Sequence, residues 1–115
     1  MNYDLEERTF NFARNCRDFV KKIPRTVTNL EYIKQLTRSS SSPAANYIEA
    51  CENLSKKDFY HRIKICRKEA KESRLWLRLI VVDDQNLENQ RNKLIQEALE
   101  LTKIFGAIVN KQKKE

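Results

Sequence analysis

The sequence predicts an all-α protein, an up-down-up-down antiparallel four-helix bundle formed by a single domain over residues 1–115. Apolar residues recur every three or four positions in four long segments, which is the period of an amphipathic helix. The chain has one Gly and two Pro, which are too few turn-forming residues for the many tight turns of a β fold. The connections between the segments are short, so consecutive helices should pack as antiparallel neighbours.

The first helix is expected from about Asp4 to Ile23. Pro24 ends it, because proline lacks a backbone donor and disfavours helix in the residue before it. The apolar stripe of this helix contains Leu5, Phe10, Phe12, Ala13, Cys16, Phe19, Val20 and Ile23.

The second helical segment contains a run of serines followed by a proline, residues 39–43, which are poor helix formers. The apolar register agrees on both sides of this run. We therefore expect one long helix over Leu30–Cys51, kinked near Pro43, in preference to two short helices joined by a linker. Thr28 or Asn29 is the expected N-cap. The small side chains of the run would let a neighbouring helix approach closely.

Ser55 is the expected N-cap of the third helix, which should run to about Val82. A polar turn over residues 83–86 leads to a fourth helix that begins near Leu87. The basic tail, residues 111–115, is expected to fray.

The third segment carries most of the excess positive charge. Residues 55–82 contain nine Lys or Arg and three Asp or Glu, a net charge of +6, whereas the whole chain carries +7. Spacings of three and four place one set of residues on a single helix face: Tyr60, Lys64, Arg67, Lys71, Arg74 and Arg78. Cations neutralise phosphates and an aromatic ring can stack on a base, so this face is the candidate nucleic-acid-binding site. No base-reading motif accompanies it, and binding should follow backbone charge or shape.

A second group on the third helix is more apolar than one core seam requires. Ile65, Trp76 and Leu79 are predicted on the flank opposite the basic face, and Leu75 and Val82 add to the apolar surface of this helix. Large exposed apolar patches on soluble proteins usually contact a partner. The candidate oligomer interface therefore consists of Ile65, Leu75, Trp76 and Leu79. The alternative is a broad core stripe.

The sequence offers little for catalysis or metal binding. Cys16, Cys51 and Cys66 share no C-x-x-C spacing and fall on apolar stripes, so we expect buried, reduced thiols. His61 is the only histidine, which excludes a di-iron site of the kind found in helical bundles. We expect no catalytic residues, no metal site and no cofactor.

The chain shows no apolar run long enough to span a membrane. Its acidic, polar start lacks the features of a signal peptide, so a cytoplasmic location without a membrane partner is expected. A pI near 9.5 favours acidic partners.

Several strings occur in a fixed order that is typical of one protein family. They are Asp4–Phe10, the pair Ile23-Pro24, Gln35–Ser39, Ala45–Ala50, Ser55–Phe59 and Lys68–Leu77. Together they resemble, over nearly the full chain, the four-helix-bundle proteins encoded in intervening sequences of bacterial 23S rRNA genes. The resemblance implies a subunit of a homo-oligomer, typically a ring of five, and it supplies no catalytic residues. Family members often have Gly where this chain has Ser40 and Ala44.

A related branch of that family is the accessory variability protein of diversity-generating retroelements. The resemblance implies a basic barrel that works with a reverse transcriptase and binds nucleic acid. Two functions therefore stay open. The first is a non-catalytic homo-oligomer, a pentamer on the resemblance, that binds RNA or DNA backbone through the basic face. The alternative is a protein-interaction scaffold or accessory subunit for an acidic protein such as a reverse transcriptase.

Overall fold

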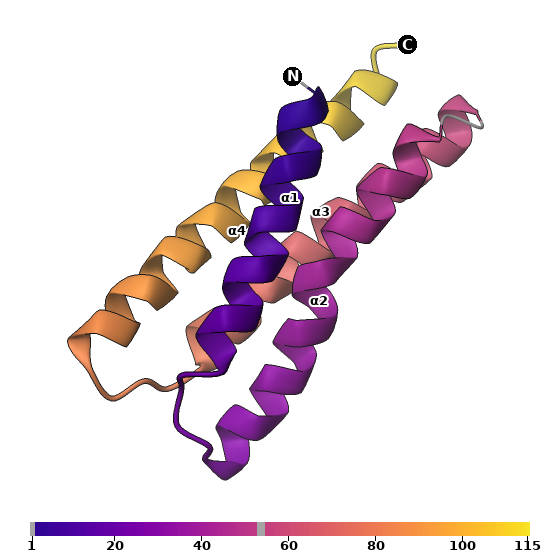
Figure 1. The fold of residues 1–115 in the computed structure, drawn as a ribbon. Coiled ribbons are helices and arrows are strands. Elements are labelled where there is room, and N and C mark those ends of the chain that lie inside the picture. Colours follow the sequence, from indigo (N-terminus) through magenta and orange to yellow (C-terminus); the bar gives the residue numbers. More distant parts are fainter. Residues whose placement is uncertain (1, 53–54) are drawn as a thin grey trace.

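The structure is a computed structural model that describes residues 2–52 and 55–115. Within these residues the regular secondary structure consists of four α-helices. Their bounds are α1 Asn2–Val20, α2 Val27–Cys51, α3 Lys56–Leu79 and α4 Gln85–Gln112. Each helix runs antiparallel to the next, and both termini lie at the same end of the bundle (Figure 1). α1 packs on α2 and α4, and α3 packs on α2 and α4, which closes the ring of neighbours. The predicted four-helix bundle is confirmed.

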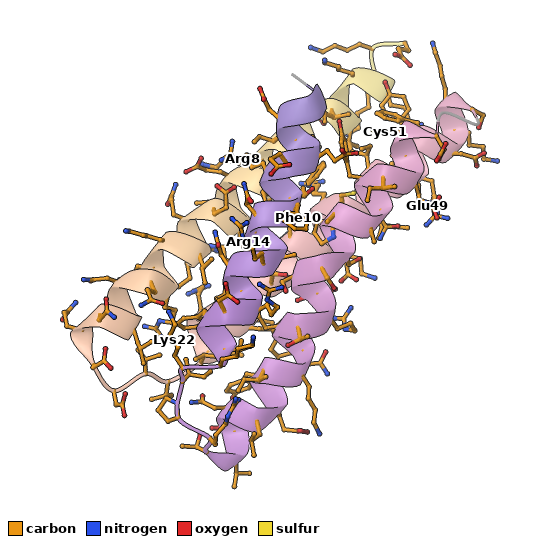
Figure 2. The ribbon with its side chains drawn as sticks, in the orientation of Figure 1. Arg8, Phe10, Arg14, Lys22, Glu49 and Cys51 are labelled. Carbon is orange, nitrogen blue, oxygen red and sulfur yellow. The ribbon has the colours of Figure 1, made fainter. Side chains whose placement is uncertain are left out.

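The core follows the predicted stripes of the four helices. The largest apolar side chains that are fully buried are Phe12, Phe19, Leu36, Ile63, Leu77, Ile80, Leu101 and Phe105. Phe10 departs from the prediction, because 52% of its surface is exposed. It lies at the margin of the α1 stripe, where Arg14 covers its ring at 5.7 Å (Figure 2). None of the helices in the described parts of the chain combines the length and apolar character needed to cross a membrane.

The first connection differs from the predicted boundaries at both ends. α1 ends at Val20, three residues before Ile23, although Ile23 stays buried as the apolar pattern requires. α2 begins earlier than predicted, with Thr26 as its N-cap. The hydroxyl of Thr26 accepts the backbone N–H of Asn29 at 3.2 Å, so neither residue predicted as the cap has that role.

Asn29 instead joins the two connections at this end of the bundle. Its buried side chain donates from Nδ2 to the carbonyls of Pro24 (3.0 Å) and Val81 (2.8 Å). Its Oδ1 accepts the backbone N–H of Val81 at 3.0 Å. Because the backbone of Val81 is bonded to Asn29 rather than to the preceding turn, α3 ends at Leu79 and not at Val82 as predicted.

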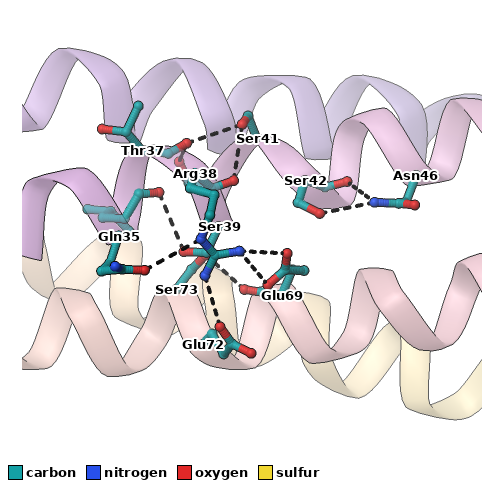
Figure 3. Close-up of polar contacts among 12 residues, drawn as sticks. Gln35, Thr37, Arg38, Ser39, Ser41, Ser42, Asn46, Glu69, Glu72 and Ser73 are labelled. Atoms are coloured by element: carbon teal, nitrogen blue, oxygen red, sulfur yellow. Dashed lines mark hydrogen bonds and ion pairs between the residues drawn. The ribbon is translucent and has the colours of Figure 1, made fainter.

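α2 is a single helix that continues through Pro43, which confirms one helix in preference to two. The kink at Pro43 stays a prediction. The small residues on both sides of the seam let α2 and α3 approach closely, as expected. The hydroxyls of Ser39 and Ser73 meet at 2.9 Å in this seam (Figure 3), and Cys66 Sγ donates to the Pro43 carbonyl at 3.4 Å.

All three cysteines are free, but they are not all buried. Burial raises the pKa of Cys16 and of Cys66 to about 12, so both thiols stay protonated at neutral pH. Cys51 is exposed, contrary to the prediction, because it occupies the last turn of α2 at the margin of the core (Figure 2).

α4 is longer than predicted at both ends. It begins at Gln85 after Asp84, whose carboxylate accepts a backbone N–H of the first turn. It ends at Gln112, so part of the tail predicted to fray is helical. Glu115 also accepts a hydrogen bond from the hydroxyl of Tyr60 at 3.1 Å, which ties the last residue to α3.

We expect Asn29→Ala to lower the free energy of unfolding by about 2–3 kcal/mol, because it removes three hydrogen bonds that hold the two connections together. Urea denaturation followed by circular dichroism measures the change. Asn92→Ala, at an exposed position of α4, is the control and should change stability by less than about 0.5 kcal/mol. Equal effects of the two substitutions would contradict this role of Asn29.

Candidate functional site

The basic face of α3 forms an open groove of about 570 Å³. Its lining consists of Lys64, Arg67, Lys68, Lys71, Glu72, Arg74, Leu75 and Arg78. The structure thus brings together all five predicted cations and adds Lys68, whose spacing of four from Lys64 could have revealed it. Arg74 is partly buried, while the other four predicted cations are exposed. The last of these cations lies fourteen positions after the first, or about 21 Å along the helix.

Tyr60 does not belong to this exposed face. Only 6% of its surface is accessible, and its ring packs edge-on against Phe59 with the ring centroids 5.2 Å apart. Its hydroxyl is bonded to Glu115. The predicted stacking of Tyr60 on a base is therefore incompatible with this arrangement, because neither face of the ring is offered to a ligand.

Arg38 of α2 forms ion pairs with two acidic residues of α3. Its guanidinium contacts Glu69 at 2.9 Å and Glu72 at 3.0 Å (Figure 3). The hydrogen bonds to Glu69 and then to Glu72 raise the pKa of Arg38 above its ordinary value. The acids of mid-α3 are therefore neutralised at the α2 seam, although Glu72 also reaches the margin of the groove.

The cations of the groove have no such partners. Across residues 2–52 and 55–115, none of the five predicted cations forms an ion pair. Their helical neighbours are themselves cations, in the pairs Lys64/Lys68, Arg67/Lys71 and Arg74/Arg78. A like-charge pair at this spacing destabilises a helix by about 0.2–0.5 kcal/mol. The groove therefore maintains a repulsion that a bound anion would relieve.

Arg8 shows how an arginine with a structural role differs. It crosses from α1 to α4 and contacts Glu97 and Glu100, each at 2.7 Å. The hydrogen bond to Glu97 is the largest cause that raises the pKa of Arg8. An arginine with two carboxylate partners is committed to the fold, whereas those of the groove remain available.

The four residues predicted as an oligomer interface differ in how far they are exposed. Trp76 is partly buried and stacks on Tyr32 of α2, with the ring centroids 6.2 Å apart. Ile65 is also partly buried, whereas Leu75 is 45% and Leu79 is 40% exposed. Leu75 lines the basic groove, because its helical position lies next to that of the cations.

His61 is exposed on α3 and borders a small hollow with Glu49 and Asp58. In the part of the chain that the structure describes, no group of three or more His, Cys, Asp or Glu is arranged to hold a metal ion.

An antiparallel four-helix bundle with one continuous basic helix face is the class of protein that these observations define. The chain belongs to the 23S rRNA-intervening sequence protein family, whose model matches residues 1–107. This match confirms the resemblance noted in the sequence.

A solved structure supports the same fold. It is the crystal structure of a protein of unknown function from the S23 ribosomal protein family of Bacteroides thetaiotaomicron. The two chains superimpose with a TM-score of 0.77 at 24% sequence identity, over 95% of this chain and 97% of the other. No curated protein matches the chain.

Lys71→Glu should stabilise the unbound protein at low ionic strength, because it converts repulsion from Arg67 and Arg74 into attraction. We expect the melting temperature to rise by about 2–4 °C in a buffer without added salt, and the gain to shrink as salt is added. Differential scanning calorimetry measures both effects. A lower melting temperature would show that Lys71 has a stabilising contact and would contradict the account of repulsion in the groove.

Proposed function

We propose that this protein is a non-catalytic homo-oligomer that binds the backbone of RNA or DNA through the basic groove of α3. The observation that carries the proposal is the absence, within the described residues, of an ion pair to any of five neighbouring cations. These cations are Lys64, Arg67, Lys71, Arg74 and Arg78. Because the family is described by an intervening sequence of 23S rRNA, RNA is the first nucleic acid to test.

The shape of the groove supports binding to the backbone rather than to bases. An array of cations about 21 Å long can contact several successive phosphates, and each neutralised phosphate releases counterions. No aromatic side chain lines the groove to serve as a stacking platform. If all five cations contact phosphates of a duplex, the association constant should fall as salt is added. A plot of its logarithm against the logarithm of the salt concentration should have a slope of roughly −4 to −5.

The combined substitution Arg67→Glu, Lys71→Glu and Arg74→Glu should abolish this binding. We expect the dissociation constant for a short RNA duplex, and for a DNA duplex of equal length, to rise by about a hundredfold or more at low salt. Fluorescence anisotropy over a series of salt concentrations measures the affinity and its slope.

The matched control is Lys21→Glu, Arg25→Glu and Lys93→Glu. These residues are exposed cations outside the groove, and replacing them changes the net charge equally. The control should weaken binding by less than about threefold at the same salt concentration. Unchanged affinity of the groove variant, or equal losses in both variants, would contradict the groove as the binding site.

The second candidate function is that of an accessory subunit for an acidic protein, such as a reverse transcriptase. Leu75 favours it, because an apolar side chain that is 45% exposed among cations suits a protein surface better than a phosphate backbone. A wild-type protein that binds neither duplex at low salt would favour this function over the first.

We further propose that α3 supplies the contact between subunits, through Leu75 and Leu79 together with Ile65 and Trp76. A ring of such subunits would repeat the basic groove and multiply its field. Light scattering should then return a multiple of the 13.7 kDa chain mass, five copies if the resemblance holds. Leu79→Glu should lower that mass by placing a charge in the interface.

Val27→Glu is the control for this test, since Val27 is an aliphatic residue of α2 that is 84% exposed. It should leave the mass unchanged. A monomeric wild-type protein would contradict the oligomer, and an intact oligomer of the Leu79→Glu variant would place the interface elsewhere.

A further inference from the structure

One cation of the groove differs from the others in its unsatisfied hydrogen bonding. Within the described residues, three buried side-chain nitrogens lack a partner: Nε of Arg74, Nε1 of Trp76 and Nε of Arg91. The Arg91 guanidinium is nevertheless held by the Ile80 carbonyl and by Glu88 through its other nitrogens. Among the residues that the structure describes, the Arg74 guanidinium has neither a hydrogen-bond acceptor nor an ion-pair partner for any of its nitrogens. A buried donor left in this state costs about 1–3 kcal/mol, more for a charged group.

The register of α3 against α4 brings Arg74 opposite a residue of α4 whose side chain cannot accept a hydrogen bond. The side chain of Arg67 lies over Gly106, where a Cβ atom would be 3.5 Å from Nε of Arg67. Because the two helices are antiparallel, the register that places Gly106 opposite Arg67 places Leu99 opposite Arg74. Leu99 has no side-chain acceptor. The neighbours of Arg74 three positions before and four positions after it on α3 are also cations.

We propose that Arg74 is the phosphate anchor of the basic groove. Its guanidinium binds one phosphate group end-on, with its two Nη groups donating to two oxygens of that phosphate, since Nε is buried and the Nη groups are not. Arginine presents these donors in a planar fork that matches the geometry of phosphate, which the ammonium group of lysine cannot reproduce. The other four cations are exposed and neutralise neighbouring phosphates by their charge, without a fixed geometry. This assignment rests on the proposed function, since the phosphate is a phosphodiester of the bound nucleic acid.

Replacing an arginine by lysine separates the effect of the guanidinium geometry from the effect of the positive charge. Arg74→Lys keeps the charge and removes the fork, so we expect the dissociation constant for the RNA duplex to rise by about tenfold at fixed salt. The salt dependence should stay the same, because the number of neutralised phosphates is unchanged. Arg67→Lys and Arg78→Lys are the matched controls and should weaken binding by less than about threefold. Thermal denaturation verifies that all three variants are folded.

Equal affinities of the three lysine variants for the RNA duplex would overturn the assignment of Arg74 as the phosphate anchor. If the triple glutamate variant still lost binding in that case, backbone binding by the groove would stand without a special role for Arg74. The two proposals can therefore fail separately.

Nuclear magnetic resonance of the arginine side chains gives a second measurement that does not depend on nucleic acid. Titration of the wild-type protein with inorganic pyrophosphate should shift the Nε–H signal of Arg74 more than those of Arg67 and Arg78. A selective shift in a protein that binds neither duplex would support Arg74 as an anion site while contradicting the nucleic acid as its ligand. A signal of Arg74 that moves no more than the other two would overturn the anchor.

Discussion

The distribution of charge in this bundle depends on Arg38, which reaches from α2 to two carboxylates of α3. It can contact both because the seam beneath it is built from small residues, with Ser39 facing Ser73. Arg38 is about half exposed, so water screens its ion pairs and they add little to stability. Their main consequence is positional. Glu69 and Glu72 pair with α2, so Glu72, the acid that lines the groove, is bonded to Arg38 and not to the cations beside it.

Arginines in other helices show why the lack of ion pairs in the groove matters for function. Arg8 and Arg38 each contact two carboxylates of a neighbouring helix. The cations of the groove have like-charged neighbours on α3, and α4 presents uncharged residues such as Leu99 and Gly106 beside them. A helix whose charges served only its own stability would alternate signs at spacings of three and four. Family membership establishes the fold and names no ligand, so the functional proposal rests on this contrast.

The sequence predicted the helices better than their ends. The periodicity of apolar residues is a local property that survives in any helix, and it identified all four segments and the continuity of α2 through Pro43. The end of α3 was missed because a residue far away in the chain decides it, since the Asn29 side chain binds the backbone of Val81. Phe10 was assigned to the core for a related reason. Periodicity identifies a stripe, but it does not show how far a neighbouring helix covers its margin.

By itself the sequence determined that this protein is a four-helix bundle whose third helix concentrates positive charge on one face. Those features follow from residue identity and from the 3.6-residue turn of the helix, which are the same in any surroundings. Only the tertiary structure decided which members of that face are available to a ligand. Tyr60 is removed from it by Phe59 and Glu115, and Arg74 is left without an acceptor. Burial and ion pairing depend on which residues of two helices face one another, and only the packing of the helices determines that.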